Sequence, residues 1–311
     1  MELIIEIGTN STKTVIVNDF HYYDERVNSG RIGEGLFETK HLSERAIEGN
    51  ISILREIFDY YQDSTILNPS NFGGICNKEV IEVSIIATQA LRTAVNCDVF
   101  CDRVMEEFGV KIHVLTSEEE AICAFKSQYP RVNDVVLDIG GGSTEIVSLS
   151  KNGDIVCDSY PIGVVYLKDL CSREIGVFDS AKGFYLYIEG VLKECMAIRT
   201  SPLQKSLTGI GGTSVALGMI KKSLDRFIAD KIEGTEMSID EIREIWDVLY
   251  SGVSDKYSIA LIQEILKDRA DVIIYGVGIL LYVMKQFGMN KVSVSCRGVR
   301  HGYKYYLNQS I

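Results

Sequence analysis

Two stretches of the chain place apolar runs on both sides of a glycine turn in the same order. Leu3–Ile7 and Thr14–Val17 flank the first turn, and residues 135–149 repeat the arrangement 132 positions later, so that Leu3 to Val17 falls on Val135 to Leu149. Short apolar or alternating runs around a turn of small and polar residues are typical of β-hairpins. The sequence therefore predicts a duplicated strand–turn–strand unit.

The rest of the pattern predicts the same order of elements twice. In the first half we expect a polar loop after residue 17 through Gly35, helices near 43–61, 97–108 and 117–129, and strands at 80–86 and 111–115. In the second half we expect a strand near 155–161, helices from Val164 and Ser180, a strand-to-helix turn at 207–214 and a buried helix at 271–284. Ser238 and Glu241 have capping-box spacing, and Ser117 is the N-cap that we expect for the helix at 117–129. This pattern indicates an α/β protein of repeated fold.

Length and composition fit a globular protein with two domains. The 311 residues are 46% hydrophobic, and the formal net charge of −11 argues against a general nucleic-acid or anionic-membrane surface. An anionic substrate would require a locally basic cleft. The longest apolar runs, such as residues 277–284, are far shorter than the roughly 20 residues that span a bilayer. No basic segment precedes the first apolar stretch, so we expect no signal peptide and a cytoplasmic location.

Cysteine and histidine positions indicate neither a zinc site nor a covalent hydrolase. The eight cysteines form no Cys-x-x-Cys pair, and none of the four histidines stands at zinc-ligand spacing from them. Cys97 and Cys101 would share a helix face as i and i+4. We interpret the cysteines as reduced, half-buried or buried thiols.

Each glycine turn follows a carboxylate, Glu6 in the first copy and Asp138 in the second. Glycine lets the backbone approach a ligand, and a carboxylate before the turn can hold a divalent cation that a phosphate shares. The amide and hydroxyl donors that suit phosphate oxygens belong to Asn10, Ser11, Ser143 and Thr144. A ligand-free β-hairpin is the alternative for either copy alone, but duplication of carboxylate, glycine, serine and threonine together favours phosphate.

A series of short motifs extends this picture over essentially the whole chain. They are Ile-Gly-Thr-Asn-Ser at 7–11, Gly-Glu-Gly-Leu at 33–36, Ala-Thr-x-x-Leu-Arg at 87–92, Ser-Glu-Glu-Glu-Ala at 117–121, Asp-Ile-Gly-Gly-Gly-Ser-Thr-Glu at 138–145, Pro-Ile-Gly at 161–163, Gly-Gly-Thr at 211–213, Arg-Ala-Asp at 269–271 and Gly-Val-Arg at 298–300. By their order, the chain resembles the exopolyphosphatase and guanosine pentaphosphate phosphatase family in its short two-domain form.

The resemblance implies two duplicated ribonuclease-H-like domains of the acetate kinase, sugar kinase, Hsc70 and actin superfold. We expect these domains at 1–124 and 125–311, with the active site in the interdomain cleft. For the last helix, packing on the first domain is an alternative that the sequence leaves undecided. Some apolar stretches are long enough to form a dimer interface, which is consistent with a homodimer. The alternative is that these stretches pack in the core.

The resemblance also assigns roles to residues. Glu120 matches the glutamate that orients or deprotonates the attacking water, and Arg92 matches the arginine that faces the substrate. Asp138 matches the metal-binding aspartate, with Glu145 and Glu6 as further metal carboxylates. The substrate-binding residues that we expect are Thr9, Asn10, Ser11, Gly140, Gly141, Gly142, Ser143, Thr144, Gly211, Gly212, Thr213, Arg269 and Arg300.

Local chemistry alone leaves two of these assignments open. Glu118, Glu119 and Glu120 are equally suitable acids for a helix N-terminus, so only the resemblance selects Glu120. Arg269 and Arg300 would serve equally well in surface or interdomain ion pairs.

The implied activity is magnesium-dependent hydrolysis of the terminal phosphoanhydride of inorganic polyphosphate. Guanosine pentaphosphate, the nucleotide of the stringent response, is the nearest alternative substrate. Two departures stand out: Glu6 replaces the usual aspartate, and Cys296 beside Arg297 replaces an aspartate common before the Gly-x-Arg motif. They motivate a second hypothesis, a non-hydrolytic sensor of polyphosphate or alarmone. A sugar or acetate kinase is a third, which the stretch at 117–121 disfavours.

Overall fold

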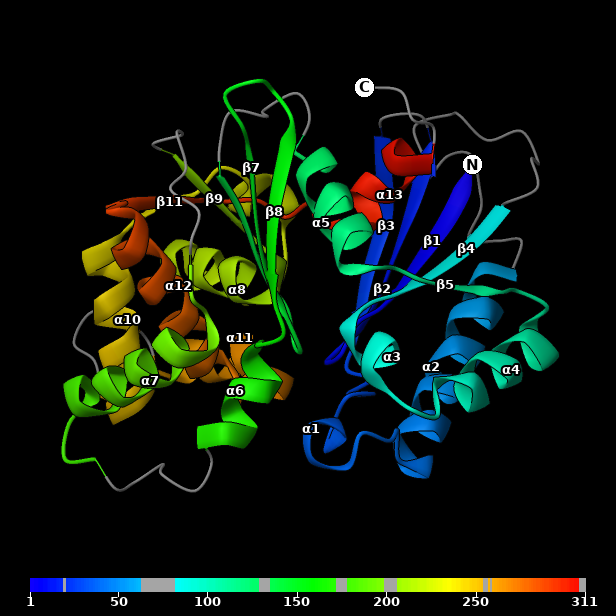
Figure 1. Cartoon of the computed structure of the whole chain (residues 1–311), viewed down its shortest axis with the longest axis horizontal. Helices are drawn as coiled ribbons and strands as arrows, with labels where there is room; N and C mark the ends of the chain where they lie inside the picture. The colour runs from blue at the N-terminus through cyan, green and yellow to red at the C-terminus, as the bar shows by residue number, and fades with distance from the viewer. Residues whose placement is uncertain are drawn as a thin grey trace. The chain divides into compact units, whose positions relative to one another are not determined.

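The structure, a computed structural model, describes residues 1–18, 21–62, 82–128, 135–171, 178–198, 206–253, 257 and 259–307. The chain divides into two compact units, Met1–Glu120 and Ala121–Ile311, whose elements are labelled in Figure 1. The expected domain boundary between residues 124 and 125 stays a prediction.

The first unit contains a five-stranded sheet in the order β3-β2-β1-β4-β5. Its strands are β1 (Glu2–Ile7), β2 (Thr12–Asn18), β3 (His21–Asn28), β4 (Glu82–Ala87) and β5 (Ile112–Val114). The β1–β2 and β2–β3 pairs are antiparallel, whereas the β1–β4 and β4–β5 pairs are parallel. This is the order and direction of a ribonuclease-H-like sheet, so the predicted fold class is confirmed for this unit.

Helices α1 (Leu36–Thr39), α2 (Glu44–Gln62), α3 (Gln89–Thr93) and α4 (Cys97–Phe108) complete the first unit. Ile47, Ile51 and Leu54 of α2 are buried in one core cluster with sheet residues such as Ile5. Their spacing is that of one face of a helix, so α2 forms because this apolar stripe has a sheet to cover. The Oγ of Ser43 accepts a hydrogen bond from the Ala46 amide at 3.2 Å, which confirms the predicted start of this helix.

Strand β3 corrects the prediction of a polar loop through residue 35. It lies at the edge of the sheet, and most of its residues are half-buried rather than alternately buried and exposed. Its pairing with β2 also shifts register between Thr14 and Ile16. An edge strand has one neighbour and tolerates polar side chains, so no apolar face identified it in the sequence.

The second unit contains a six-stranded sheet in the order β10-β11-β9-β6-β7-β8. Its strands are β6 (Val135–Ile139), β7 (Thr144–Leu149), β8 (Ile155–Tyr160), β9 (Leu207–Ile210), β10 (Glu236–Ser238) and β11 (Lys291–Val294). The β6–β7 and β7–β8 pairs are antiparallel, and the β6–β9 and β9–β11 pairs are parallel. The first sheet is thus repeated strand for strand, with β10 added as an antiparallel edge. The predicted duplication is confirmed.

The helical part of the second unit surrounds one buried helix. Its elements are α6 (Val164–Cys171), α7 (Ala181–Cys195), α8 (Gly211–Lys222), α9 (Ala229–Ile232), α10 (Ile239–Ser251), α11 (Ile259–Leu266), the 3-10 turn η2 (Lys267–Arg269), α12 (Ile273–Phe287) and α13 (Val299–Leu307). Tyr275 to Met284 of α12 are all buried, as the apolar run predicted. A Cβ on Gly278 would lie 3.0 Å from Ile188 and 3.3 Å from Trp246, so α12 packs closely on α7 and α10 (Figure 1). In the described part of the chain, no helix combines the length and the apolar character that crossing a bilayer requires.

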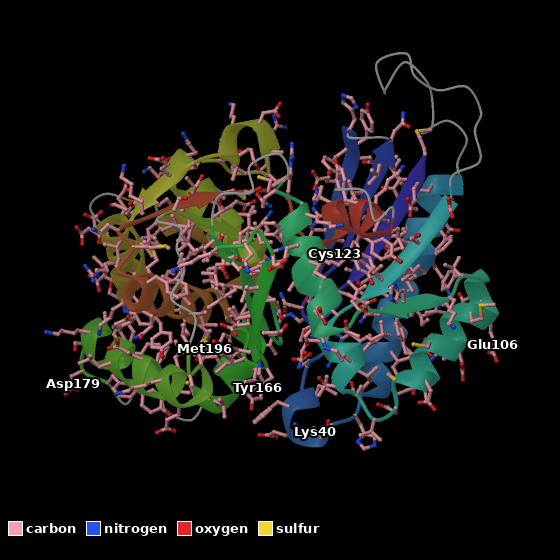
Figure 2. The ribbon with its side chains drawn as sticks, turned by 45° about the horizontal axis from the view of Figure 1, so that its top comes forward. Lys40, Glu106, Cys123, Tyr166, Asp179 and Met196 are labelled. Atoms are coloured by element: carbon pink, nitrogen blue, oxygen red, sulfur yellow. The ribbon has the colours of Figure 1, made fainter. Side chains whose placement is uncertain are left out.

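Helix α5 (Ser117–Lys126) begins in the first unit and ends in the second, where it contacts α13. Gly302 of α13 lies so close to the Cys123 carbonyl that a Cβ at this position would overlap the oxygen. The Lys126 Nζ donates to the Tyr305 carbonyl at 3.2 Å, and Figure 2 labels Cys123 on α5 beside α13. Glycine at position 302 therefore permits this close approach of two helices.

Replacement of Gly302 by alanine tests this contact. Because the new methyl group would overlap backbone atoms, we expect Gly302→Ala to lower the free energy of unfolding by about 3 kcal/mol or more, at the upper end of overpacking effects. The measurement is urea-induced unfolding followed by circular dichroism. Gly190→Ala in α7 is the matched control, because a Cβ there meets nothing within 4 Å; it should stabilise the protein by up to about 1 kcal/mol. Equal effects of the two variants would contradict the close packing.

The capping box of α10 predicts a pH dependence of stability. The Ser238 Oγ accepts from the Glu241 amide at 3.2 Å, and the Glu241 carboxylate accepts from the Ser238 amide at 2.8 Å. The hydrogen bond from Lys221, followed by that from Ser238, lowers the pKa of Glu241 from 4.5 to about 2. A carboxyl group with a depressed pKa stabilises the folded state above its unfolded pKa, and this stability is lost as the pH falls through the folded pKa.

We therefore expect wild-type stability to fall between about pH 5 and pH 2, and Glu241→Gln to remove part of this fall. Because the group is partly exposed and screened, the effect should be about 1 kcal/mol. Thermal unfolding across this pH range measures it. Asp247→Asn, on the exposed face of the same helix, should show the same dependence of thermal stability on pH as the wild type. If Glu241→Gln also shows the wild-type dependence, the capping box is not the source of the fall in stability.

Candidate functional site

The two glycine turns close in the same way. In the first unit the Gly8 amide donates to the Ser11 carbonyl at 3.0 Å, and in the second unit the Gly140 amide donates to the Ser143 carbonyl at 3.0 Å. The flanking strands pair from Ile7 with Thr12 and from Ile139 with Thr144. The repeat that the sequence predicts is therefore a repeat of backbone geometry.

A second glycine fixes each turn from the loop that follows the third strand. The Gly33 amide donates to the Thr9 carbonyl at 3.0 Å, and a Cβ on Gly33 would overlap the Thr9 side chain. In the second unit a Cβ on Gly163 would lie 2.5 Å from the Gly140 carbonyl oxygen. The Val164 amide donates to that same oxygen at 3.0 Å. Both turns are thus rigid because another segment packs directly against their backbone.

Some hydrogen-bond donors of the second turn are used within the protein, and others can donate to a ligand. Thr144, which we expected to bind substrate, is fully buried and donates its Oγ1 to the Ile162 carbonyl at 2.6 Å. Ser143 is 2% exposed. Within the described ranges, the amides of Gly141 and Gly142 donate to no backbone carbonyl. The turn therefore offers backbone donors to an anion, while Thr144 holds the loop in place.

The first turn carries the corresponding small polar residues. Thr9 and Ser11 are buried, whereas Asn10 is half-buried. The carbonyl groups of Thr9 and Asn10 accept from the Gly33 and Arg31 amides at 3.0 and 3.1 Å. With its carbonyls occupied, this turn also presents mainly donors.

The carboxylate before each turn has a different cross-strand partner. Glu6 faces Lys13 in the β1–β2 register, and the Lys13 Nζ lies 2.6 Å from the Glu6 Oε1. Asp138 faces Glu145 in the β6–β7 register, and the Ser159 Oγ donates to the Glu145 Oε1 at 2.9 Å. Asp138 is 9% exposed and Glu145 is 1% exposed. The second unit thus places two buried carboxylates on one face of a hairpin.

The N-terminus of α8 lies against the same cluster. Gly211 has φ +81°, and a Cβ there would lie 2.7 Å from the Asp138 Oδ1. A Cβ on Gly212 would lie 2.7 Å from the Arg269 Nη1. Thr213 is buried, and its side chain packs on Gly276 of α12. Carboxylate, guanidinium and helix N-terminus therefore meet at one edge of the second sheet, a setting suited to a phosphate and its counterion.

Arg300 and Cys296 follow β11 at the same edge of the sheet. Arg300 is buried in the first turn of α13. The Cys296 amide donates to the Glu233 Oε2 at 2.7 Å, and the Ser295 Oγ donates to it at 3.2 Å. A carboxylate is thus present next to Cys296, but it comes from the end of α9 and holds the loop backbone. A substrate-binding role of Arg300 stays a prediction.

In the first unit Arg92 and Glu120 contact each other directly. The Arg92 Nη1 lies 2.9 Å from the Glu120 Oε2 and also donates to the Leu115 carbonyl at 2.6 Å. Its Nη2 donates to the Gln89 Oε1 at 2.6 Å. The Glu120 side chain is 8% exposed and that of Arg92 is 20% exposed. These contacts hold a largely desolvated carboxylate in a defined orientation.

The three neighbouring acids of α5 have different surroundings. The Glu119 carboxylate accepts from the Thr116 amide at 2.7 Å, and the Glu119 amide donates to the Thr116 Oγ1 at 3.2 Å. Thr116 is therefore the N-cap, and the prediction of Ser117 was wrong by one residue, because a threonine with a glutamate three positions later completes a capping box. Glu118 is exposed, Glu119 caps the helix, and Glu120 is buried beside Arg92. The structure thus separates three acids that the sequence left equivalent.

Several polar residues of these clusters were absent from the predicted set. They are Lys13, Gln89, Ser159 and Glu233. For Lys13 the signal was present, since the duplicated register places it where Glu145 stands in the second copy. Gln89 contacts Arg92 three positions later on the same helix, a spacing that the sequence shows. Ser159 and Glu233 make their contacts through tertiary packing and had no signal of their own.

Nearly the whole chain is similar to known proteins. The model of the Ppx/GppA phosphatase family matches residues 17–310. A bifunctional 3-dehydroquinate synthase/phosphatase of Fusobacterium nucleatum is 26% identical over 94% of this chain and 44% of its own length. Exopolyphosphatase 2 of Mycobacterium tuberculosis is 25% identical over 96% of this chain and 95% of its own.

A guanosine-5'-triphosphate,3'-diphosphate pyrophosphatase of Vibrio campbellii is 25% identical over 97% of this chain and 58% of its own. The chain thus spans about half the length of two of these three relatives. The crystal structure of an Aquifex aeolicus Ppx/GppA family member superposes with a TM-score of 0.73 at 26% identity, covering 99% of this chain and 98% of that one.

The Arg92–Glu120 pair predicts a large effect on stability. Arg92→Met leaves a buried carboxylate without its guanidinium, so we expect the free energy of unfolding to fall by about 2–3 kcal/mol. The measurement is chemical unfolding at neutral pH. Arg103→Met is the control, because the glutamates that Arg103 pairs with, Glu44 and Glu48, are 74% and 52% exposed; its effect should stay within about 0.5 kcal/mol. An Arg92 variant as stable as this control would show that Glu120 is solvated.

Proposed function

The chain belongs to the Ppx/GppA phosphatase family, and from this premise we propose that the protein hydrolyses the terminal phosphoanhydride of inorganic polyphosphate and releases orthophosphate. The observation that carries the proposal is the buried Glu120 carboxylate, oriented by Arg92 at 2.9 Å. A fixed and poorly hydrated carboxylate is suited to orient a water molecule and accept its proton. The name Exopolyphosphatase 2 of a relative matched over nearly its full length supports this substrate.

Arg92 would contribute charge as well as orientation. A guanidinium has five N–H donors, and the contacts with Leu115, Glu120 and Gln89 use three of them. The two that remain are available to non-bridging oxygens of a terminal phosphoryl group. A planar, permanently charged donor near the attacked phosphorus stabilises the charge that spreads over these oxygens in the transition state.

The donor set of the second unit fits Mg²⁺. Magnesium is bound in proteins by one or two carboxylates, with water and substrate phosphates completing its shell. Asp138 and Glu145 would supply those carboxylates. Among the described residues no group of three or more His, Cys, Asp or Glu side chains is arranged for a metal ion. When bound, the ion would neutralise phosphate charge and polarise a phosphoryl oxygen.

The rest of the second cluster would bind the substrate chain. The amides of Gly141 and Gly142 and the N-terminus of α8 at Gly211 would donate to phosphate oxygens. Arg269, whose guanidinium contacts Gly212, would neutralise the leaving phosphate. In this scheme the turn, Arg269 and the helix N-terminus of the second unit would hold the anion. A covalent intermediate is not required.

Guanosine pentaphosphate hydrolysis is the alternative activity. It is favoured by the relatives named guanosine-5'-triphosphate,3'-diphosphate pyrophosphatase. Both substrates present a terminal phosphoryl group on an anionic leaving group, so the same chemistry serves either. The cytoplasmic location and the homodimer expected from the sequence stay predictions.

The test is phosphate release from long-chain polyphosphate and, in parallel, from guanosine pentaphosphate, both with Mg²⁺. We expect Glu120→Gln to lower kcat by about 10²–10⁴-fold, the range lost with a general base, while KM changes little. The faster substrate for the wild type identifies the activity.

Glu118→Gln is the matched control, because this neighbouring acid is exposed on the same helix turn. It should change kcat by less than about threefold, as surface substitutions away from the chemistry do. Full activity of Glu120→Gln, or equal losses in both variants, would sink the assignment of Glu120. Binding of both substrates without turnover by the wild type would favour the sensor hypothesis instead.

A further inference from the structure

Helix α4 of the first unit carries two thiols on one face. Cys97 and Cys101 stand four positions apart on this helix (Figure 1), and no two other cysteines of the sequence are so close in position. Both are half-buried, form no disulfide and pack against the core cluster of the first unit. Residues four apart on a helix are neighbours, with Cβ atoms about 5–6 Å apart. The proposed hydrolysis uses neither thiol.

Negative charge surrounds this thiol pair. Burial raises the pKa of the Cys101 thiol to about 11, and the neighbouring Cys97 contributes to the shift, so the two sulfur atoms are close enough to interact. Asp98 and Asp102 directly follow the two cysteines in the sequence and are exposed. Arg103, the basic residue of this helix, is already paired with two glutamates of α2. The acidic side chains therefore leave a negative potential that attracts a cation.

The spacing of the pair suits an ion between the sulfur atoms better than a disulfide. The Cβ atoms of a disulfide lie about 3.5–4.5 Å apart, closer than the about 5–6 Å between neighbouring turns of a helix. A metal–thiolate bond is about 2.3 Å long, so a linear bridge of sulfur, metal and sulfur spans about 4.6 Å. Rotation of each side chain about its Cα–Cβ bond can give this separation while the helix stays intact. A folded α4 therefore disfavours the disulfide and permits the bridging ion.

We propose that Cys97 and Cys101 form a two-thiolate binding site for a soft cation of low coordination number, of which Cu⁺ is the representative. Soft sulfur ligands select soft cations, and Cu⁺ is stable with two sulfur ligands, whereas structural Zn²⁺ sites take four ligands. On binding, each thiol releases its proton to the solvent and each sulfur forms one bond to the ion, with no change in oxidation state. The site contains none of the residues proposed for hydrolysis.

The test is titration of the reduced, metal-free protein with Cu⁺ under anaerobic conditions, in competition with bicinchoninate, which forms a coloured complex with Cu⁺. We expect the wild type to hold one more ion per chain against this chelator than either Cys97→Ser or Cys101→Ser, because a single thiolate does not chelate. Serine is close to cysteine in size, and circular dichroism verifies that the variants are folded.

Two further variants control for the number of thiols. Cys195→Ser removes an exposed cysteine of α7 and should bind Cu⁺ as the wild type does. Cys101→Ser/Asp102→Cys keeps the number of cysteines but moves the second thiol to an exposed position five residues from Cys97. Positions five apart do not share a helix face, so this variant should lose the ion as Cys101→Ser does.

Two results would overturn the inference. The first is equal Cu⁺ content in the wild type, Cys97→Ser and Cys101→Ser, which would show that the two thiols do not bind one ion together. The second is retention of the ion by Cys101→Ser/Asp102→Cys, which would show that the shared helix face is not what holds it.

Discussion

The cross-strand register of the two hairpins is the constraint on which the candidate site depends. Side chains alternate between the faces of a strand, so a slip of one residue would turn the acid of either hairpin to the opposite face. The bonds from Gly8 to Ser11 and from Gly140 to Ser143 fix this register at the turn. Gly33 and Gly163 then hold each turn from outside, where a larger side chain would overlap it. Rigid backbone geometry therefore determines which charges face each other.

Most of the fold could be predicted because the two copies of the repeat have apolar residues at equivalent positions. Strand β3 could not, because an edge strand of half-buried polar residues has no apolar face to mark it. The candidate site divides in the same way. The turns and their acids follow local sequence, whereas Glu120 is distinguished from Glu118 and Glu119 by its burial and by its contact with Arg92, 28 positions away. Burial and pairing of this kind arise from contacts between residues that are far apart in the sequence, so a short segment does not predict them.

In the proposed function, Arg92 would serve structure and chemistry together. Its contacts with Gln89 and the Leu115 carbonyl fix the guanidinium plane before any substrate arrives. The Arg92 side chain is therefore already ordered in the folded protein, and binding of a phosphate would cost little further side-chain entropy. Such ordering in advance is called preorganisation. A lysine at this position would carry the charge without the planar set of donors that joins three acceptors at once.

The contact between Gly302 and the Cys123 carbonyl packs the last described helix directly against α5. Helix α5 carries Glu120 near its start and meets α13 near its end. Helices in such close backbone contact cannot slide past each other without a steric clash. Any side chain at position 302 would force the two helices apart, so a carbonyl oxygen on α5 limits which residue can stand near the end of the chain.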